Sequence, residues 1–300
     1  MFIKWKCLHG FSLVELLCAI LLSTVIFGVA ISILSGCIQS YEQVLALTEA
    51  SRRGEMVLQI LRLPAENAGL GIPFDPADYK SALCIGKTTI PALYGWTGPV
   101  SVQGNELRLV YAVPTSTVNE ALASETNPSG DCTIRLSAAP KAGQVEAWSG
   151  VGPSRTRSWV VFAPSHYPFL VTSLSNQTLS VRSARPSWIP HEGSLSYLRA
   201  LRALVVCFPG QEPAFCTEDM TTGSGLQERV LGISGFKAEL DPETRILTLR
   251  VLSRGGKRHS RMISPATLTG WPGTIPEENR HYVLSVSTWM CRIRNGGESI

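Results

Sequence analysis

Residues 11–38 read FSLVELLCAILLSTVIFGVAISILSGCI, a run of 28 residues in which Glu15 is the only charged side chain. As a helix this run would be about 42 Å long at about 1.5 Å per residue, enough to cross a hydrocarbon core of about 30 Å with some tilt. The apolar region of a secretory signal usually holds about 7 to 15 residues. The greater length here predicts a membrane-spanning helix that is not removed at the usual signal cleavage site.

The residues on either side of this run predict its orientation. Ahead of it, MFIKWKCLHG carries Lys4 and Lys6, and a long region of mixed charge follows it. By the positive-inside rule, the short basic end stays in the cytoplasm and the larger part is translocated. We therefore expect a single-pass membrane protein whose bulk lies outside the cytoplasm.

Glu15 is the unusual residue of the apolar run. A carboxylate at membrane depth costs roughly 3 kcal/mol, so such a group is expected to have a partner and a function. The alternative is that Glu15 lies at the interface and extends its carboxylate to water.

The sequence around Glu15 resembles a known signature. Residues 10–17 (GFSLVELL) are similar to the N-terminus of type IV prepilins and type II secretion pseudopilins, in which a short basic leader and a glycine precede Phe, Ser or Thr, and then a Glu within an apolar helix. The resemblance implies that residues 1–10 are a leader peptide, cleaved after Gly10 by a prepilin peptidase, and that the new terminal Phe11 is N-methylated. It also implies that Glu15 pairs with the Phe11 amine of a neighbouring subunit, because a carboxylate in low dielectric is tolerable when paired with an ammonium group.

The helical pattern continues beyond the apolar run. Between residues 39 and 63, apolar side chains recur every three to four positions with polar side chains between them, which predicts an amphipathic continuation. Pro64 is expected to end it, since proline interrupts the backbone hydrogen bonds of a helix. Residues 11–63 would then form one rod of about 80 Å, with 11–38 in the membrane and 39–63 amphipathic.

Three small residues recur every fourth position within the membrane segment. Gly28, Ser32 and Gly36 would lie on one face of the helix. Small residues in this spacing allow close approach of another helix. They are candidate helix-packing residues, although small residues are also common in apolar helices.

The rest of the chain, residues 64–300, is predicted to be a β-rich domain. Runs at 106–113, 159–163, 204–208, 245–252 and 282–292 are rich in β-branched and aromatic residues or alternate in polarity. A short hairpin turn is expected at Gly255-Gly256. The predicted fold class is α+β, with the long N-terminal helix packed on a mainly antiparallel sheet, as in pilin-like subunits, and with β-rich insertions between about 72 and 225.

The C-terminal third also resembles a subgroup of this family. The segment from residue 228 onward, and RLPAENAGLGI after the rod, are similar to large PilW-like minor pilins and J-type pseudopilins. One departure is Glu66, where that subgroup often has Arg.

Five cysteines would face an oxidising exterior, where cysteines tend to pair. Cys207 and Cys216 bracket FPGQEPAF, whose prolines and glycine reverse the chain, so a disulfide worth roughly 2 to 3 kcal/mol is predicted there. Cys84 with Cys132 is the next candidate pair, which would leave Cys291 unpaired. Spacing leaves the connectivity open.

No motif in the sequence predicts catalysis, a metal site or a cofactor. The five histidines are isolated and no Cys-x-x-Cys occurs. Gly-x-Ser-x-Gly, His-Glu-x-x-His and Gly-x-Gly-x-x-Gly are also missing from the sequence. We therefore expect a protein that is not an enzyme.

A basic cluster follows the predicted C-terminal hairpin. Arg254, Lys257 and Arg258 flank Gly255-Gly256. Charged hairpin tips commonly protect sheet edges and promote solubility. The alternative is a contact for DNA or an acidic partner, although the net charge of +4 is too small for general nucleic-acid binding.

The functional prediction is a minor, low-copy pilin-like structural subunit that takes part in pilus assembly or initiation. Its partners would be the prepilin peptidase, the other subunits of the filament and the inner membrane, where its globular part faces the periplasm before assembly into a surface pilus or periplasmic pseudopilus. Several alternatives are open: a type II secretion pseudopilin, a tip adhesin or DNA-uptake pilin, and a membrane-anchored periplasmic enzyme. A lipoprotein is a further alternative, since residues 34–37 (LSGC) fit a lipobox ending at Cys37.

Overall fold

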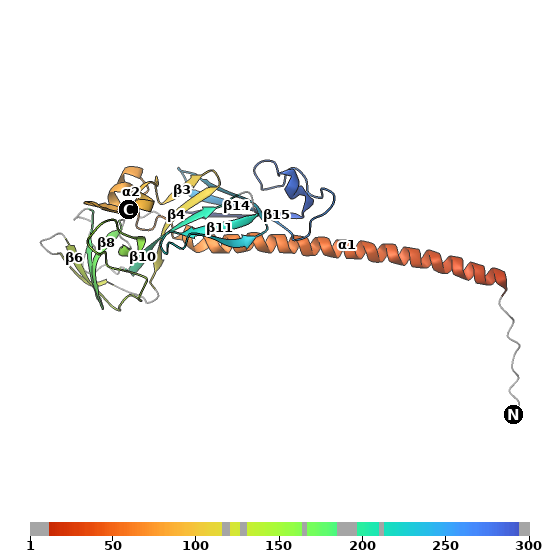
Figure 1. Cartoon of the computed structure of the whole chain (residues 1–300), viewed down its shortest axis with the longest axis horizontal. Coiled ribbons are helices and arrows are strands. Elements are labelled where there is room, and N and C mark those ends of the chain that lie inside the picture. The colour runs from red at the N-terminus through yellow and green to blue at the C-terminus, as the bar shows by residue number, and fades with distance from the viewer. Residues whose placement is uncertain are drawn as a thin grey trace, which may run out of the picture.

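The structure, a computed structural model, describes residues 12–115, 121–126, 131–163, 167–184, 197–209 and 213–293. A single long helix, α1 (Leu13–Glu66), begins far outside the globular part and ends within it (Figure 1). Its 54 residues correspond to about 80 Å at about 1.5 Å per residue. The globular part, called the head below, comprises the described residues after Glu66.

The helix ends slightly later than the sequence predicted. Pro64 lies inside α1, and the helix continues to Glu66. Proline lacks only its own backbone N–H, so the N–H groups of the residues after it can still donate hydrogen bonds. The backbone N–H and the side-chain Nδ2 of Asn67 both donate to the Leu63 carbonyl, at 3.2 and 2.9 Å, and close the last turn beyond the proline.

The sheet that covers the C-terminal part of α1 has three antiparallel strands. They are β13 (Ile233–Leu240), β14 (Ile246–Arg254) and β15 (Leu284–Arg292), in the order β13-β14-β15. The C-terminal part of α1 packs across β14 and β15 and also contacts β4 and β12 (Figure 1).

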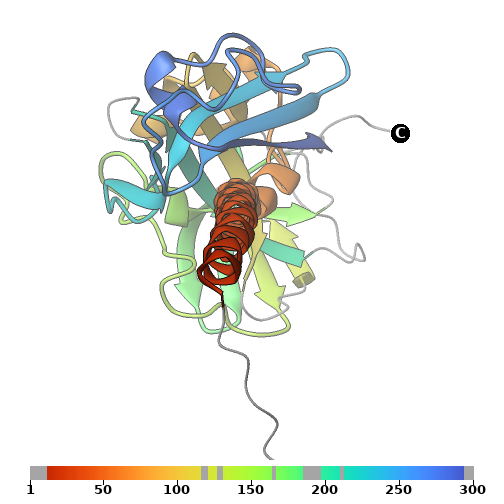
Figure 2. The same cartoon turned by 90° about the vertical axis from the view of Figure 1, so that its right-hand side faces the viewer.

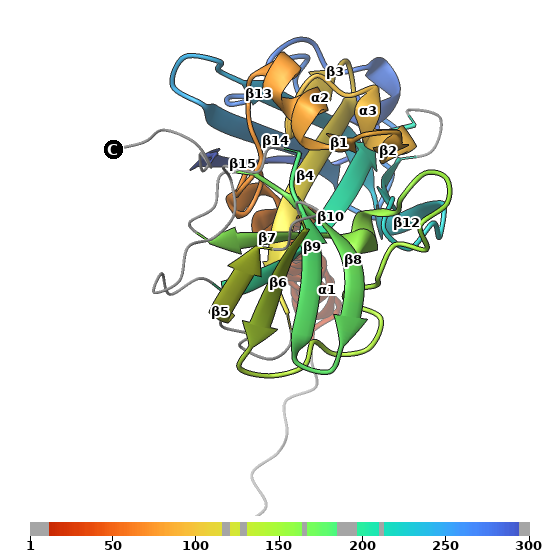
Figure 3. The same cartoon turned by 90° about the vertical axis from the view of Figure 1, so that its left-hand side faces the viewer.

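Ten of the other described strands form a second, larger antiparallel sheet. Its order is β12-β11-β10-β7-β8-β9-β6-β5, with β4 added to the other edge of β10 and β3 beside β4 (Figure 3). The strands are β3 (Val100–Gln103), β4 (Glu106–Pro114), β5 (Ala121–Thr126), β6 (Asp131–Leu136), β7 (Trp159–Ala163), β8 (Phe169–Ser175), β9 (Thr178–Arg182), β10 (Tyr197–Cys207), β11 (Ala214–Asp219) and β12 (Leu226–Leu231).

Short elements fill the connections between these strands. They are α2 (Pro76–Ala82), β1 (Cys84–Ile85), β2 (Thr88–Thr89), α3 (Pro91–Tyr94), η1 (Thr156–Ser158) and η3 (Glu277–His281). α2, α3 and the β1–β2 pair lie together beside β3 and β4 (Figure 3).

The strands with the longest apolar runs lie between two cores. On β7, Trp159 and Val161 pack in one buried cluster while Val160 and Phe162 pack in another. Successive side chains of a strand point to opposite faces, so a strand buried on both faces must be apolar at every position. This explains the uninterrupted sequence WVVFA.

A third core joins α1 to both sheets. Val57 and Leu61 of the helix are fully buried against Leu247, Leu249 and other apolar residues of the three-stranded sheet. The same cluster includes Phe215 of β11, so the helix is held between the two sheets.

The predicted fold class is confirmed: the chain has an α+β, pilin-like architecture with a long N-terminal apolar helix packed against antiparallel sheets. The runs predicted as strands at 106–113, 159–163, 204–208, 245–252 and 282–292 overlap β4, β7, β10, β14 and β15.

The short hairpin predicted at Gly255-Gly256 is wrong. β14 ends at Arg254, but its partner β15 begins at Leu284, so the connection is residues 255–283. Neither glycine has a positive φ, the feature that tight hairpin turns require of glycine. Gly255 is instead needed for a close approach to α1, described below.

Candidate functional site: the exposed half of α1 and its junction with the head

The N-terminal part of α1 has no cover within the described chain. From Leu13 to Leu45 its apolar side chains are exposed on every face, with Leu13 76%, Phe27 67% and Leu34 61% exposed, and the first buried residue is Ala46. We call residues 13–45 the exposed half and residues 46–66 the covered half. Within the described residues, the exposed half gives α1 the length and apolar composition to cross a membrane.

Glu15 lies at the start of this exposed half and has a partner in its own chain. Its Oε2 accepts the Ser12 backbone N–H at 3.0 Å, while the Ser12 hydroxyl accepts the Val14 N–H at 3.2 Å. This reciprocal arrangement is a capping box, which satisfies backbone donors that the first turn of a helix leaves free. The predicted cleavage and methylation positions, Gly10 and Phe11, lie outside the described residues.

The predicted packing residues Gly28, Ser32 and Gly36 all lie in the exposed half. A Cβ added at Gly28 or Gly36 would meet no atom within 4 Å. This face of the helix is therefore open to a partner outside the chain.

The close helix packing that the structure does contain lies further along α1. Ala46, Ala50 and Gly54 recur every fourth residue and are all buried. A Cβ at Gly54 would lie 3.0 Å from the Cβ of Ser287 on β15 and closer still to its hydroxyl. The helix backbone therefore lies almost directly on the sheet along these three residues, which we call the seam.

The sheet side of the seam also consists of small residues. A Cβ at Gly255 would lie 2.9 Å from the Ala46 carbonyl oxygen, and the Ser253 hydroxyl donates to the Ala50 carbonyl at 2.6 Å. The seam was missed from the sequence, although its four-residue spacing repeats the pattern of Gly28, Ser32 and Gly36.

Polar contacts fasten the same edge of the head to α1. Arg53 Nη1 donates to the Arg254 carbonyl at 2.7 Å, and Glu49 Oε2 accepts the Gly256 N–H at 2.8 Å. Lys257 forms an ion pair with Glu42 at 2.5 Å. These contacts connect the end of β14 and the residues after it to about three turns of the helix, from Glu42 to Arg53.

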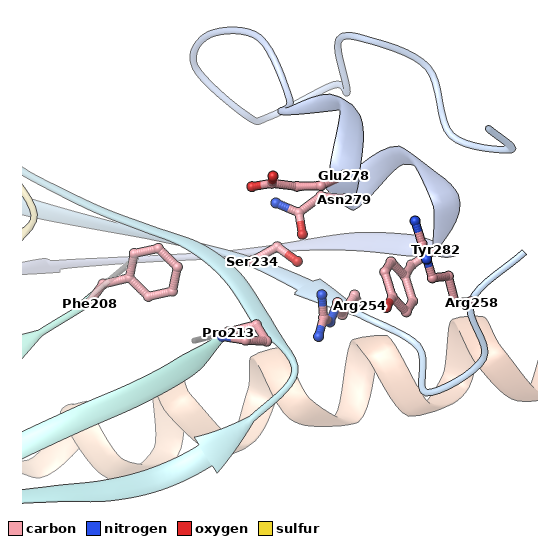
Figure 4. Close-up of a pocket in the computed structure, with 8 residues that line it drawn as sticks. All are labelled: Phe208, Pro213, Ser234, Arg254, Arg258, Glu278, Asn279 and Tyr282. Carbon is pink, nitrogen blue, oxygen red and sulfur yellow. The ribbon is translucent and has the colours of Figure 1, made fainter. Parts of the chain in front are cut away.

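Two of the three predicted basic contact residues have partners within the chain. Lys257 is paired with Glu42, and the Arg254 guanidinium stacks on Tyr282 with 4.3 Å to the ring centroid. Arg258 is exposed and lines a cavity of about 310 Å³ together with Glu278. Figure 4 shows this cavity between β13, the end of β14 and η3.

The predicted Cys207–Cys216 pair is close but not bonded. These cysteines are directly opposite each other in the register of β10 and β11, and no disulfide bond joins them. Burial, together with the negative charges of Glu106 and Glu218, raises the pKa of the Cys207 thiol and disfavours the thiolate.

The predicted Cys84–Cys132 disulfide is not formed either. Cys84 lies on β1 of the small two-stranded sheet, whereas Cys132 is buried on β6 in the core next to β7, β8 and β9. β1 pairs with β2 in its own sheet, whereas β6 lies between β9 and β5 near one end of the ten-stranded sheet. Among the described residues, no group of three or more His, Cys, Asp or Glu side chains is placed to hold a metal ion.

No family model, curated protein or solved structure matches this chain. The functional inference below therefore depends on the sequence around Glu15 and on the geometry of α1.

Proposed function

We propose that this protein is a minor, low-copy pilin-like subunit that is inserted in the inner membrane and then packed by α1 into a filament. The observation that supports the proposal most directly is the exposed half of α1, which projects from the head and is apolar on every face from Leu16 to Ile38. A helix that is apolar on every face is stable when lipid or other helices surround it. The membrane would provide the first environment, and neighbouring subunits the second.

The size of the head favours a low copy number. The globular part extends from the end of α1 to the last described residue at 293 and contains two packed sheets. A bulky head limits how closely identical subunits can be stacked along a fibre, so we place this subunit at a tip or an initiation complex. Labelling along the whole filament by an antibody against the head would contradict that position.

Glu15 is the residue that would set the register between subunits. Its carboxylate already accepts one hydrogen bond from Ser12, and a carboxylate can accept several. The second oxygen is thus chemically able to pair with the terminal amine of an adjacent mature chain. In a low-dielectric filament core this ion pair would favour the one axial position that brings the two groups together.

Replacement of Glu15 by Gln tests this role. A glutamine oxygen can still accept the Ser12 N–H, so Glu15→Gln removes the charge while it preserves the capping box. We expect normal processing of the leader and incorporation into filaments reduced by about tenfold or more, because the amine of the neighbour loses its counter-ion. The measurement is quantitative immunoblotting of sheared filaments against the membrane pool.

The matched control is Glu55→Gln, which removes one charge from an exposed position of the same helix within the covered half. It should incorporate like the wild type. Wild-type incorporation of Glu15→Gln would contradict the role of Glu15 in register.

A further inference from the structure

The connection between β14 and β15, residues 255–283, lies beside α1 at the point where the helix leaves the head. Figures 1 and 2 show it as the blue segment on the side of the head that faces the exposed half. Its start is fixed to the helix, because Gly255 packs on Ala46 and Lys257 pairs with Glu42. The residues of α1 that it contacts therefore give its position along the helix axis.

That position corresponds to the surface of a bilayer crossed by the exposed half. The apolar run ends at Ile38, so Ser40 lies about 3 Å and Glu42 about 6 Å beyond it along the helix axis. The polar layer of a bilayer adds about 5 to 8 Å on each side of the hydrocarbon core. The exposed Tyr41 is typical of this layer, where tyrosine is enriched.

Part of the connection forms an apolar groove with α1 at this depth. Ser40, Val44 and Leu47 of the helix line it on one side, and Ile263 and Leu268 on the other, around a volume of about 510 Å³. The neighbouring Met262 is 49% exposed and Ile263 is 42% exposed.

The connection that forms this groove also carries exposed cations. Arg258 and Arg261 are exposed, next to Lys257 in its pair with Glu42. The acidic residues of the connection are Glu277 and Glu278, and Glu278 lies across the cavity from Arg258. Five Lys or Arg side chains against two Glu leave residues 254–283 with a net charge of +3.

We propose that residues 257–268 form a lipid-contact loop that binds the anionic phospholipid headgroups of the bilayer that α1 crosses. This inference rests on the membrane insertion in the proposed function. Arg258 and Arg261 contact lipid phosphates, each basic group near an anionic surface contributing about 1 kcal/mol. Met262 and Ile263 enter the interfacial layer, as the apolar side chains of peripheral membrane segments do. The contact holds the head at a fixed height above the bilayer before assembly.

Oxidation of methionine by hydrogen peroxide measures this contact without a label. Peroxide converts the thioether to the sulfoxide and is itself reduced to water, and the rate depends on access from the aqueous phase. Met262 is the reporter. Met290 is an internal control, since it is 64% exposed and lies on β15 about 20 Å beyond Leu284, away from the bilayer.

The full-length protein would be placed in lipid nanodiscs of phosphatidylcholine alone or with about one third phosphatidylglycerol, and oxidation followed by peptide mass spectrometry. We expect Met262 to oxidise about tenfold more slowly in the anionic discs, and Met290 at the same rate in both. The double variant Arg258→Gln/Arg261→Gln should lose the protection of Met262. Lys257 is left in place because it holds the loop on Glu42.

The control variant removes two positive charges at positions outside the connection. Lys87→Gln/Lys141→Gln replaces two exposed cations outside the connection and should keep the protection of Met262. Equal Met262 rates in the two lipids, with the chain retained in the discs, would overturn the lipid contact alone. Failure of the chain to enter the discs would overturn both this inference and the membrane step of the proposed function. Protection in neutral discs that increases with the number of copies per disc would assign the groove to a second copy instead and overturn the lipid assignment.

Discussion

The two halves of α1 form one continuous helix but meet different surroundings. The exposed half is apolar on every face from Leu16 to Ile38, and it contacts the described head only at its last turns, where Glu42 pairs with Lys257. The covered half is amphipathic, and its buried face carries small residues and then Val57 and Leu61. The two halves of this one helix therefore differ in amino-acid composition.

This difference shows where each half obtains its stability. The covered half is stabilised by close packing on β14 and β15, with backbone separations that only small residues allow. Within the described residues the exposed half has no such partner, and in the proposed function lipid or other subunits bury its apolar surface. Substitutions in the two halves should consequently affect different properties.

The largest expected effect on stability is that of Gly54→Leu in the seam. The new side chain would overlap Ser287 and force α1 away from the sheet, which we expect to lower the free energy of unfolding by about 3 kcal/mol. In detergent-solubilised full-length protein this corresponds to a decrease in Tm of about 10 °C for a domain of this size. Circular dichroism of the β-rich head would report it.

Gly36→Leu is the matched change in the exposed half. Nothing lies within 4 Å of a Cβ at Gly36, so the head should melt within about 1 °C of the wild type. Incorporation into filaments should decrease instead, because the small-residue face is blocked. Equal losses of head stability from the two substitutions would contradict the distinction between the halves.

Alkaline pH should destabilise the head. Burial raises the pKa of Tyr111 to about 12, with the negative charge of Asp219 acting in the same direction, and burial raises the pKa of Tyr79 further still. The folded state thus favours the neutral phenols. Their contribution is complete below about pH 10, where unfolded tyrosine titrates, and is lost as the pH rises toward 12.

We expect Tyr111 alone to account for a decrease on the order of 2 kcal/mol over this range. Unfolding by urea at pH 9 and pH 11.5 measures it, and Tyr111→Phe should reduce the pH dependence, with Tyr79 accounting for much of the remainder. A head equally stable at both pH values would show that folding does not raise the pKa of these phenols.

A smaller effect is expected from Arg53→Gln at the junction. The guanidinium donates to the Arg254 carbonyl and pairs with Glu49, and its side chain is only 24% exposed. Loss of a charged hydrogen bond to a half-buried carbonyl should cost about 1.5 kcal/mol in urea unfolding. The control is Arg52→Gln on the exposed side of the same turn, which should stay within about 0.5 kcal/mol of the wild type.

The elements that were predicted correctly from the sequence are those that meet the same kind of environment on every side. An apolar run indicates a membrane helix because lipid is the same on every side. The run at 159–163 indicates a strand because it is rich in β-branched and aromatic residues, and Trp159 to Phe162 are buried alternately in two cores. The helix, the fold class and the main strands were predictable for this reason.

The features that the sequence did not predict depend on which distant segments meet. Gly255 is required by Ala46, which is more than 200 positions away, and the same residue in isolation favours a hairpin turn. Cys84 and Cys132 were the second candidate pair, and they lie on strands of different sheets. The roles of Lys257 and Arg254 likewise became visible only beside Glu42 and Tyr282.

The intact mass of the protein extracted from cell membranes tests the central claim most directly, because the proposed function has the exposed half enter a filament only after the leader is removed. We predict a chain that begins at Phe11 and carries one methyl group on its terminal amine. A chain that begins at Met1, or a lipid-modified chain that begins at Cys37, would contradict the assignment of α1 as a filament-forming helix.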